Sequence, residues 1–309
     1  MTTTGKILII DDDPLFVTTY QTLLKDEEGY EVDIATDRAS ALAKLEHGTT
    51  YSVVLLDQKL QGRAAENSFD LLQDIQRLAP QAKAIVVTAF ATDEAVAQAF
   101  ERGAYDYLEK NQLLQTMLRI KVRNAVEVFR DRELRRLTGA ERERAIASCW
   151  QDVTSQRDPH RKGALLEELM ALVFGSVEGF TDIQRNVRSH LEEIDIIFRN
   201  ESEDPLWRNE GPYILVECKH WTRPVGAREL REFASKLKRR HGRAKLGFFV
   251  SMSPLTSGVQ EEARRMGDGD RLIVLIEPAA LGKLVNSDDR VRVLKSLHER
   301  AVTDLSNEK

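Results

Sequence analysis

Short apolar runs alternate with amphipathic helical segments over the first 118 residues, and this alternation constrains the fold more than any other feature. The runs are KILIID, YEVDIAT, YSVVLLD, KAIVVTAF and AYDYLEK. Parallel strands need a crossover between them, and a helix between successive strands provides it. The sequence therefore predicts an α/β domain with five parallel strands and with helices covering both faces of the sheet.

A helical pattern then continues far beyond the last predicted strand. One face of it is marked by Leu114, Leu118, Val122, Ala125 and Phe129, at spacings of three and four residues. The pattern is interrupted at 138–139 and resumes up to about residue 155. We expect residues 113–155 to form a helical connector that pairs with its copy in a dimer, although its heptads are too irregular for a regular coiled coil.

The pattern changes order from about residue 161. A helix (KGALLEELMALVFG) precedes three strand-like segments (DIQRNVRS, EIDIIFRN and YILVECK). Helix, strand, helix and strand then follow (VGARELREFASKLKRRHG, KLGFFVSMS, SGVQEEARRMG and RLIVLIE), with AALGKLV at the end. This order predicts a second α/β domain with a mixed sheet.

The net charge is divided unevenly along the chain. Residues 1–118 carry 10 Lys and Arg against 19 Asp and Glu, whereas residues 119–309 carry 35 against 31. Two cysteines, no signal-peptide pattern in MTTTGKILIIDDD and no apolar run of ~20 residues favour a cytoplasmic location. The basic segment KLKRRHGRAK is either a solvated helix end or a nucleic-acid contact, and the contact candidates are Lys236, Lys238, Arg239, Arg240 and Arg243.

Chemically active side chains follow the predicted strands of the first domain. Asp11 and Asp12 follow the first strand, Asp57 ends the third, Thr88 follows the fourth and Lys110 the fifth. The carboxyl ends of parallel strands meet at one edge of the sheet, where ligands bind. Several carboxylates at one edge favour Mg²⁺, and the hydroxyl and lysine can contact a phosphoryl group on a carboxylate.

The motifs ILIIDDD, VVLLDQK, VVTAF and YLEK resemble the receiver domain of two-component response regulators, which has a flavodoxin-like (βα)5 fold, over essentially all of residues 1–118. The resemblance implies that Asp57 is the phosphoacceptor and that a sensor histidine kinase is the phosphodonor. It also implies a Mg²⁺ site formed by Asp11, Asp12, Asp57 and the main-chain carbonyl of Lys59.

The same resemblance assigns Thr88 and Lys110 as phosphoryl contacts and Tyr107 as the switch aromatic residue. Two positions depart from the family pattern. Asn111 follows the lysine where the family usually has proline, so the loop to the last helix is expected to differ. Gln61 replaces another proline, and the loop GRAAENS is about three residues longer than usual, which bears on phosphorylation kinetics.

A second group of charged residues lies in the C-terminal domain. Glu217 and Lys219 share one face of the strand YILVECK, because side chains alternate with period two. Alone, this pattern is common in surface ion pairs. Asp195 on the preceding strand and Glu167 on the helix change the interpretation, since two carboxylates and a lysine suit metal-assisted phosphodiester hydrolysis. The carbonyl of Cys218 is a further candidate ligand.

The order of these elements resembles the PD-(D/E)xK nuclease superfamily and, more closely, its Mrr-type restriction endonuclease domain, over about residues 161–286. The matching segments include GALLEELMALVF, EIDII, ILVECKHWTRPVG and LGFFVSMSPLTSG. The resemblance implies that Asp195 and Glu217 are metal ligands, Lys219 the catalytic lysine and Glu167 the helical acidic residue. Mg²⁺ is the expected ion, with Mn²⁺ as an alternative.

These observations predict three parts: a receiver (1–118), a helical connector (119–160) and a restriction endonuclease-like domain (161–309). The expected function is a homodimeric response regulator in which phosphorylation of Asp57 controls a Mg²⁺-dependent DNA endonuclease. The alternative is a regulator whose nuclease-like domain binds nucleic acid without cleaving it. RNA or single strands stay open as substrates.

Overall fold

The computed structural model describes residues 5–60, 68–89, 92–111, 113–188, 192–266 and 271–304. The chain divides between Glu133 and Leu134 into two compact units. No helix in these described ranges is both long enough and apolar enough to cross a bilayer.

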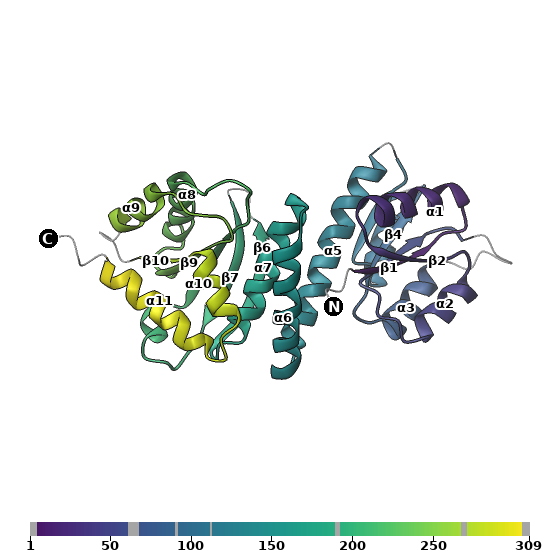
Figure 1. Cartoon of the computed structure of the whole chain (residues 1–309). Coiled ribbons are helices and arrows are strands. Elements are labelled where there is room, and N and C mark those ends of the chain that lie inside the picture. The colour runs from purple at the N-terminus through teal and green to yellow at the C-terminus, as the bar shows by residue number, and fades with distance from the viewer. Residues whose placement is uncertain are drawn as a thin grey trace. The chain divides into compact units, whose positions relative to one another are not determined.

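The first unit is a parallel five-stranded sheet with the order β2-β1-β3-β4-β5 (Figure 1). Its elements are β1 (Lys6–Ile10), α1 (Pro14–Gln21), a π-helical turn (Thr22–Glu27), β2 (Glu31–Ala35), α2 (Arg38–Glu46), β3 (Val53–Asp57), α3 (Ser68–Leu78), β4 (Lys83–Thr88), α4 (Asp93–Glu101), β5 (Asp106–Glu109) and α5 (Leu114–Arg136). The strand order reverses direction after β1, which places the carboxyl ends of β1 and β3 side by side at a switch point.

Side chains along each strand alternate between the two faces of this sheet, so the sheet has a hydrophobic core on each face. Ile7 and Ile9 on β1 pack with α1 and α5, while Leu8 and Ile10 pack with α2, α3 and α4. Figure 1 shows α1 and α5 on one side of the sheet and α2 and α3 on the other. The predicted α/β fold with helices on both faces is confirmed.

Helix α5 is 23 residues long. The residues that marked one helix face in the sequence are all buried in it, namely Leu114, Leu118, Val122, Ala125 and Phe129. The helix continues past the point where the two units divide and ends at Arg136. The last receiver helix therefore extends beyond residue 118 into the first part of the predicted connector.

The second unit contains a five-stranded sheet with the order β10-β9-β8-β7-β6. Its elements are α6 (Gly139–Ser155), α7 (Pro159–Gly175), β6 (Phe180–Arg188), β7 (Glu193–Asn200), a 3-10 turn (Trp207–Asn209), β8 (Tyr213–Lys219), α8 (Ala227–Lys238), β9 (Leu246–Ser251), α9 (Ser257–Arg265), β10 (Leu272–Ile276), α10 (Pro278–Val285) and α11 (Arg290–Asp304). Strand β7 is antiparallel to β6 and β8, whereas β8, β9 and β10 are parallel. The predicted mixed sheet is confirmed.

Each face of the second sheet has its own core. Val216 and Cys218 of β8 pack with α6, α7, α10 and α11, where Phe174, Phe198 and Trp207 form an aromatic cluster. Leu215, on the opposite face of β8, packs with α8 and α9. The face of α8 is therefore the side of the sheet toward which the odd-numbered residues of β8 point.

The connector segment has a more specific arrangement than its sequence pattern indicated. Ile146, Cys149 and Val153 of α6 are buried in the core of the second unit. Helix α11 also adds Leu294 and Leu297 to that core, and no sequence pattern had singled this helix out. The division at residues 118 and 160 stays a prediction.

Candidate functional sites

Three carboxylates gather at the carboxyl edge of the first sheet. Asp11 and Asp12 directly follow β1, and Asp57 is the last residue of β3. One oxygen of each lies within 4.8 Å of the others, with Asp11 and Asp57 buried and Asp12 partly exposed. A cluster of carboxylate oxygens fits a hard divalent cation such as Mg²⁺. Sequence reasoning had brought these three residues together.

Lys110 connects two of these carboxylates. Its Nζ lies 2.8 Å from Asp11 Oδ2 and 2.9 Å from Asp57 Oδ1, and its side chain is 5% exposed. Burial alone would lower the pKa of Lys110, but the hydrogen bonds to Asp11 and Asp57 raise it overall. Burial raises the pKa of Asp11, and the hydrogen bond from Lys110 opposes this. The lysine is therefore a fixed positive charge beside the predicted phosphoacceptor.

Thr88 and Tyr107 lie next to each other near this edge. Thr88 is buried at the end of β4, and Tyr107 is on the neighbouring strand β5. The Tyr107 hydroxyl donates to Gln58 Oε1 at 3.2 Å. Burial raises the pKa of Tyr107, while a hydrogen bond with the Thr88 side chain acts in the opposite direction. The contact links the predicted phosphoryl-binding hydroxyl to the predicted switch residue.

Predictions were also made for two loops next to this edge, one after β3 and one after β5. The backbone N–H of Lys59 donates to Asp57 Oδ2 at 3.2 Å, and metal binding by its carbonyl stays a prediction. Asn111 stands where proline was expected, and its side-chain oxygen accepts the Leu113 N–H at 3.0 Å, just before α5. Gln61 and most of the loop GRAAENS lie outside the described residues.

In the second unit, Asp195 and Glu217 lie at adjacent strand ends. Ile196 of β7 pairs with Val216 of β8, so that Asp195 and Glu217 come one residue beyond this pair. Asp195 Oδ2 accepts the backbone N–H of Cys218 at 2.7 Å. Both predicted metal ligands and the strand carrying Lys219 are thereby brought together.

The two carboxylates influence each other strongly. Burial, and next the negative charge of Glu217, raise the pKa of Asp195 to about 6. Burial would lower the pKa of Lys219, but the charges of Glu217 and Asp195 raise it overall. The site thus contains two close acids that favour a bound cation, together with a protonated lysine.

Glu217 has an ammonium group on each of its oxygens. Lys219 Nζ lies 2.7 Å from Oε1, and Lys236 Nζ of helix α8 lies 2.6 Å from Oε2. Glu217 itself is 5% exposed. Sequence reasoning placed Lys236 in a nucleic-acid-binding segment and missed this contact. The available signal was its position three residues after buried Phe233, at the border of the face of α8 that packs on the sheet.

Glu167 and Cys218 lie on the other side of the sheet from Lys236. Cys218 is buried in the core that contains α7. Burial raises the pKa of the Cys218 thiol, and the charges of Asp195 and Glu167 act in the same direction. Over the described parts of the chain, Glu167, Asp195 and Glu217 do not place one oxygen each within 4.8 Å of one another. Metal binding by Glu167 and by the Cys218 carbonyl stays a prediction.

The remaining basic residues at the end of α8 fall into two groups. Arg239 donates to Glu192 Oε2 at 2.6 and 2.8 Å, and Arg240 also bonds to Glu192. Lys238 and Arg243 are exposed. No role was predicted for Glu192, and in the structure it pairs with two of the predicted nucleic-acid contacts.

Trp221 lies two residues after the end of β8 and is flanked by two cations. Its ring centroid lies 5.6 Å from Lys219 Nζ and 4.7 Å from the guanidinium carbon of Arg223. The backbone N–H of Trp221 donates to Ser253 Oγ at 2.9 Å, which fixes the loop after β8. His220 instead packs inward, with Nε2 3.1 Å from the Val153 carbonyl.

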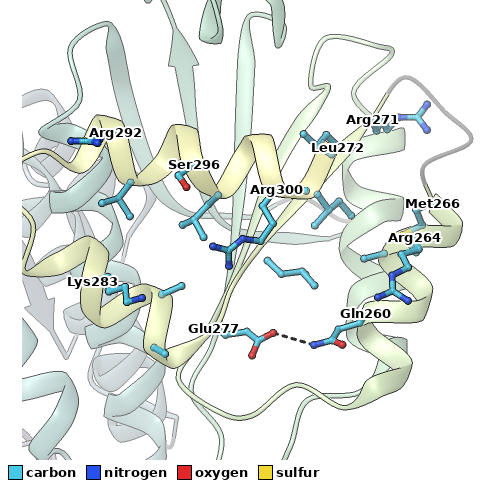
Figure 2. Close-up of a pocket in the computed structure, with 18 residues that line it drawn as sticks. Gln260, Arg264, Met266, Arg271, Leu272, Glu277, Lys283, Arg292, Ser296 and Arg300 are labelled. Atoms are coloured by element: carbon cyan, nitrogen blue, oxygen red, sulfur yellow. Dashed lines mark hydrogen bonds between the residues drawn. The ribbon is translucent and has the colours of Figure 1, made fainter. Parts of the chain in front are cut away.

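A cavity of about 660 Å³ lies elsewhere in the second unit, between α9, β10, α10 and α11 (Figure 2). Gln260 and Glu277 form a hydrogen bond of 3.4 Å within it. Its lining includes basic residues such as Lys283 and Arg300, but none of the predicted site residues. The metal ligands predicted for this unit therefore lie at the ends of β7 and β8 and not in this cavity.

Comparisons with known proteins agree with the two units. Residues 7–121 match the response regulator receiver domain family, and residues 161–285 match the restriction endonuclease family of the Mrr catalytic type. The chain is 32% identical over 106 residues to the alginate biosynthesis transcriptional regulatory protein AlgB of Pseudomonas aeruginosa, covering 34% of this chain and 22% of that protein. It is 33% identical over 136 residues to the nitrogen assimilation regulatory protein NtrX of Azorhizobium caulinodans, covering 43% and 29%.

Among solved structures, the CheY-like receiver domain protein of Methanospirillum hungatei is 30% identical. It covers 41% of this chain and 98% of its own, with a TM-score of 0.38. The chain spans only 22% and 29% of the length of the two curated regulators.

The first unit, with its parallel sheet and its acidic edge, has the flavodoxin-like architecture of a signal receiver. More particularly, the chain contains a response regulator receiver domain at residues 7–121 and a restriction endonuclease domain at residues 161–285.

Proposed function

We propose that this protein is a response regulator in which phosphorylation of Asp57 controls a metal-dependent DNA endonuclease. The observation that carries the catalytic half is the placement of Asp195 and Glu217 at adjacent strand ends, with Lys219 Nζ 2.7 Å from Glu217. A pair of carboxylates, one buried and one partly buried, together with a lysine suits metal-assisted phosphodiester hydrolysis.

The donor set of the nuclease site fits a hard divalent cation. Asp195 and Glu217 would hold Mg²⁺ or Mn²⁺, which would activate a water molecule and offset charge on the phosphate. Lys219 stays protonated beside them and stabilises negative charge as it develops on the scissile phosphate. The Cys218 N–H keeps Asp195 oriented.

The receiver half rests on the contacts of Asp57. A sensor histidine kinase would donate the phosphoryl group, and Asp11, Asp12 and Asp57 would hold Mg²⁺ next to it. Lys110 already contacts Asp57 and can follow the added negative charge. Thr88 would turn to the phosphoryl oxygens, and its contact with Tyr107 would then change.

Helix α5 is the element that can transmit this change. It begins four residues after Lys110 and continues past the division between the two units. Met117, Ile120 and Val128 on α5 are 36%, 46% and 38% exposed, and apolar residues at these spacings favour pairing of α5 with its copy. A homodimer would also provide two nuclease sites for the two strands of a duplex.

The catalytic half is tested by nicking of supercoiled plasmid with Mg²⁺, comparing wild type with Lys219→Ala. Lys283→Ala is a matched control, because Lys283 is exposed on α10, at the cavity that contains none of the predicted site residues. We expect loss of nicking by a factor of about 10² to 10³ in Lys219→Ala and little change in Lys283→Ala. Equal background nicking in all three proteins would favour the alternative, a domain that binds nucleic acid without cleaving it.

The substrate class needs a separate comparison. Duplex DNA, single-stranded DNA and RNA of equal length are digested in parallel under the same conditions. Faster cleavage of the duplex supports the proposed DNA endonuclease. Faster cleavage of RNA or of single-stranded DNA would support phosphodiester hydrolysis by this domain but with a different substrate class.

A further inference from the structure

Glu217 is neutralised from two different elements of the fold. Lys219 belongs to the same strand and contacts Oε1 at 2.7 Å, whereas Lys236 comes from α8 and contacts Oε2 at 2.6 Å. The side chains of these lysines are only 16% and 14% exposed. Both oxygens of this proposed metal ligand are thus engaged by ammonium groups of the protein itself.

A divalent cation must compete with these ammonium groups. Carboxylate oxygens are the groups that Mg²⁺ binds, and the Glu217 side chain is 6% exposed, which leaves little room for an additional ligand beside the two lysines. Asp195 Oδ2 is likewise engaged by the Cys218 N–H. At least one ammonium group therefore has to leave Glu217 before a cation can bind there.

Lys236 is better placed to leave than Lys219. Lys219 is two residues from Glu217 on the same strand, so the strand backbone keeps its ammonium group beside that carboxylate. Its Nζ is also held 5.6 Å from the Trp221 ring centroid. Lys236 lies in the last turn of α8, on a side chain with four rotatable methylene groups, next to exposed Lys238.

We propose that Lys236 is an internal counter-ion of the nuclease metal site, which competes with the divalent cation for Glu217 and thereby weakens metal binding. This inference rests on the proposed metal-dependent nuclease function. It replaces the expectation that Lys236 is primarily a nucleic-acid contact. In the metal-free protein Lys236 offsets the repulsion between Asp195 and Glu217, and metal takes over that task when it binds.

The test measures Mg²⁺ affinity of the full chain by calorimetry. Every protein carries Asp12→Asn and Asp57→Asn, which remove carboxylate ligands of the receiver site. Lys236→Met is compared with Lys238→Met, which makes the same charge change two residues away on the same helix. Tryptophan fluorescence is a second readout, because all three tryptophans, Trp150, Trp207 and Trp221, lie in the second unit.

We expect Lys236→Met to bind Mg²⁺ about fivefold more tightly or better, because an ammonium at the ligand oxygen competes with the ion and repels it. Lys238→Met is expected to stay within about twofold of the parent, since its charge is exposed and screened. Lys236→Gln keeps a donor for Glu217 without the charge. It should also bind Mg²⁺ more tightly, and it provides the measurement if Lys236→Met does not fold.

Two results would overturn the inference. Unchanged Mg²⁺ affinity in both Lys236 variants would show that Lys236 does not compete for Glu217. Weaker affinity would show that Lys236 instead positions Glu217 for the metal. Glu217→Gln separates this failure from failure of the proposed function: if the parent binds no Mg²⁺ that Glu217→Gln removes, the proposed metal site itself is wrong.

Discussion

Asp195 accepts a 2.7 Å hydrogen bond from the backbone N–H of Cys218, the residue between Glu217 and Lys219. The bond fixes the start of β7 against the end of β8, and with it the distance between the acids. The carboxylate is kept in a partly buried position next to the charge of Glu217, where its pKa rises to about 6. The site is therefore built at a cost to the stability of the metal-free fold.

Asp195→Asn is expected to stabilise the metal-free protein near neutral pH. A carboxyl group with a raised folded-state pKa binds more protons in the folded state between about pH 4 and pH 6, so stability falls as the pH rises through this window and stays lower above it. Asparagine removes this loss and keeps an oxygen for the Cys218 N–H. We expect a gain of about 1 to 3 kcal/mol at about pH 7.5 and almost none near pH 4.

Urea unfolding followed by tryptophan fluorescence measures this effect in the second unit, where all the tryptophans lie. Mg²⁺ is the internal control: it should stabilise wild type and leave Asp195→Asn nearly unchanged. An equal gain at both pH values would contradict the account, since it would assign the effect to packing rather than to charge.

Glu192→Gln is expected to increase affinity for DNA in the absence of metal. Arg239 and Arg240 now bond to Glu192, and loss of its charge makes both guanidinium groups available to phosphates. The affinity should rise severalfold at low salt, with a steeper dependence on salt concentration because more counterions are released. Fluorescence anisotropy with a labelled duplex at several salt concentrations gives both quantities.

The matched control is Glu232→Gln, which removes an exposed acid that pairs with Arg228 on the same helix. Its effect should be small, because it frees a residue outside the basic segment. If Glu192→Gln and Glu232→Gln behave alike, Arg239 and Arg240 are not part of a nucleic-acid surface and their bonds to Glu192 are purely structural.

Lys110→Met is expected to destabilise the metal-free receiver by about 2 to 4 kcal/mol, because it leaves buried Asp11 and Asp57 without their shared counter-ion. Mg²⁺ should restore a large part of that loss by neutralising the same carboxylates. Circular dichroism melts with and without Mg²⁺ measure the change. Lys25→Met, at an exposed lysine, is the control. An equal change in melting temperature in Lys25→Met would show that the effect is not specific to Lys110.

Much of the fold could be predicted from the sequence, because the spacing of apolar residues indicates which side chains are buried. The spacing of Leu118, Val122 and Phe129 predicted a helix that continues beyond residue 118, and period two predicted that Cys218 points away from Glu217. The acidic edge of the first sheet was predicted from the strand ends, because the carboxyl ends of parallel strands lie at the same edge of a sheet, irrespective of the loop sequences. In these cases a local pattern determines the position of each residue in three dimensions.

The contacts of Lys236 and Glu192 could not be predicted in this way. Both depend on how α8 packs across the sheet, and a basic helix end has the same composition whether its charges face DNA or pair with acids. Lys236 and Arg239 occupy the same charge run, yet they contact Glu217 and Glu192, 19 and 47 residues away in sequence. No sequence pattern predicted α11, because charged residues lie between the apolar positions of this helix that pack in the core.

Ile120→Glu is expected to weaken dimer formation while preserving the fold. Ile120 is 46% exposed on α5, so a charge there costs the monomer little and opposes pairing with the same residue of a second copy. Molecular mass is measured by light scattering with and without acetyl phosphate. An unchanged mass in both states would show that this face of α5 is not the dimer contact.

The central claim is that phosphorylation of Asp57 controls cleavage, and the most direct measurement is plasmid nicking with Mg²⁺ in the presence and absence of acetyl phosphate. Wild type is compared with Asp57→Asn, which keeps the shape of the side chain and cannot accept the phosphoryl group, and with Lys219→Ala. The account predicts that acetyl phosphate changes the nicking rate of wild type at least about tenfold, a coupling of about 1.4 kcal/mol. It also predicts no such change in Asp57→Asn and no nicking above background in Lys219→Ala. Equal wild-type rates with and without phosphorylation, at confirmed full modification of Asp57, would contradict it.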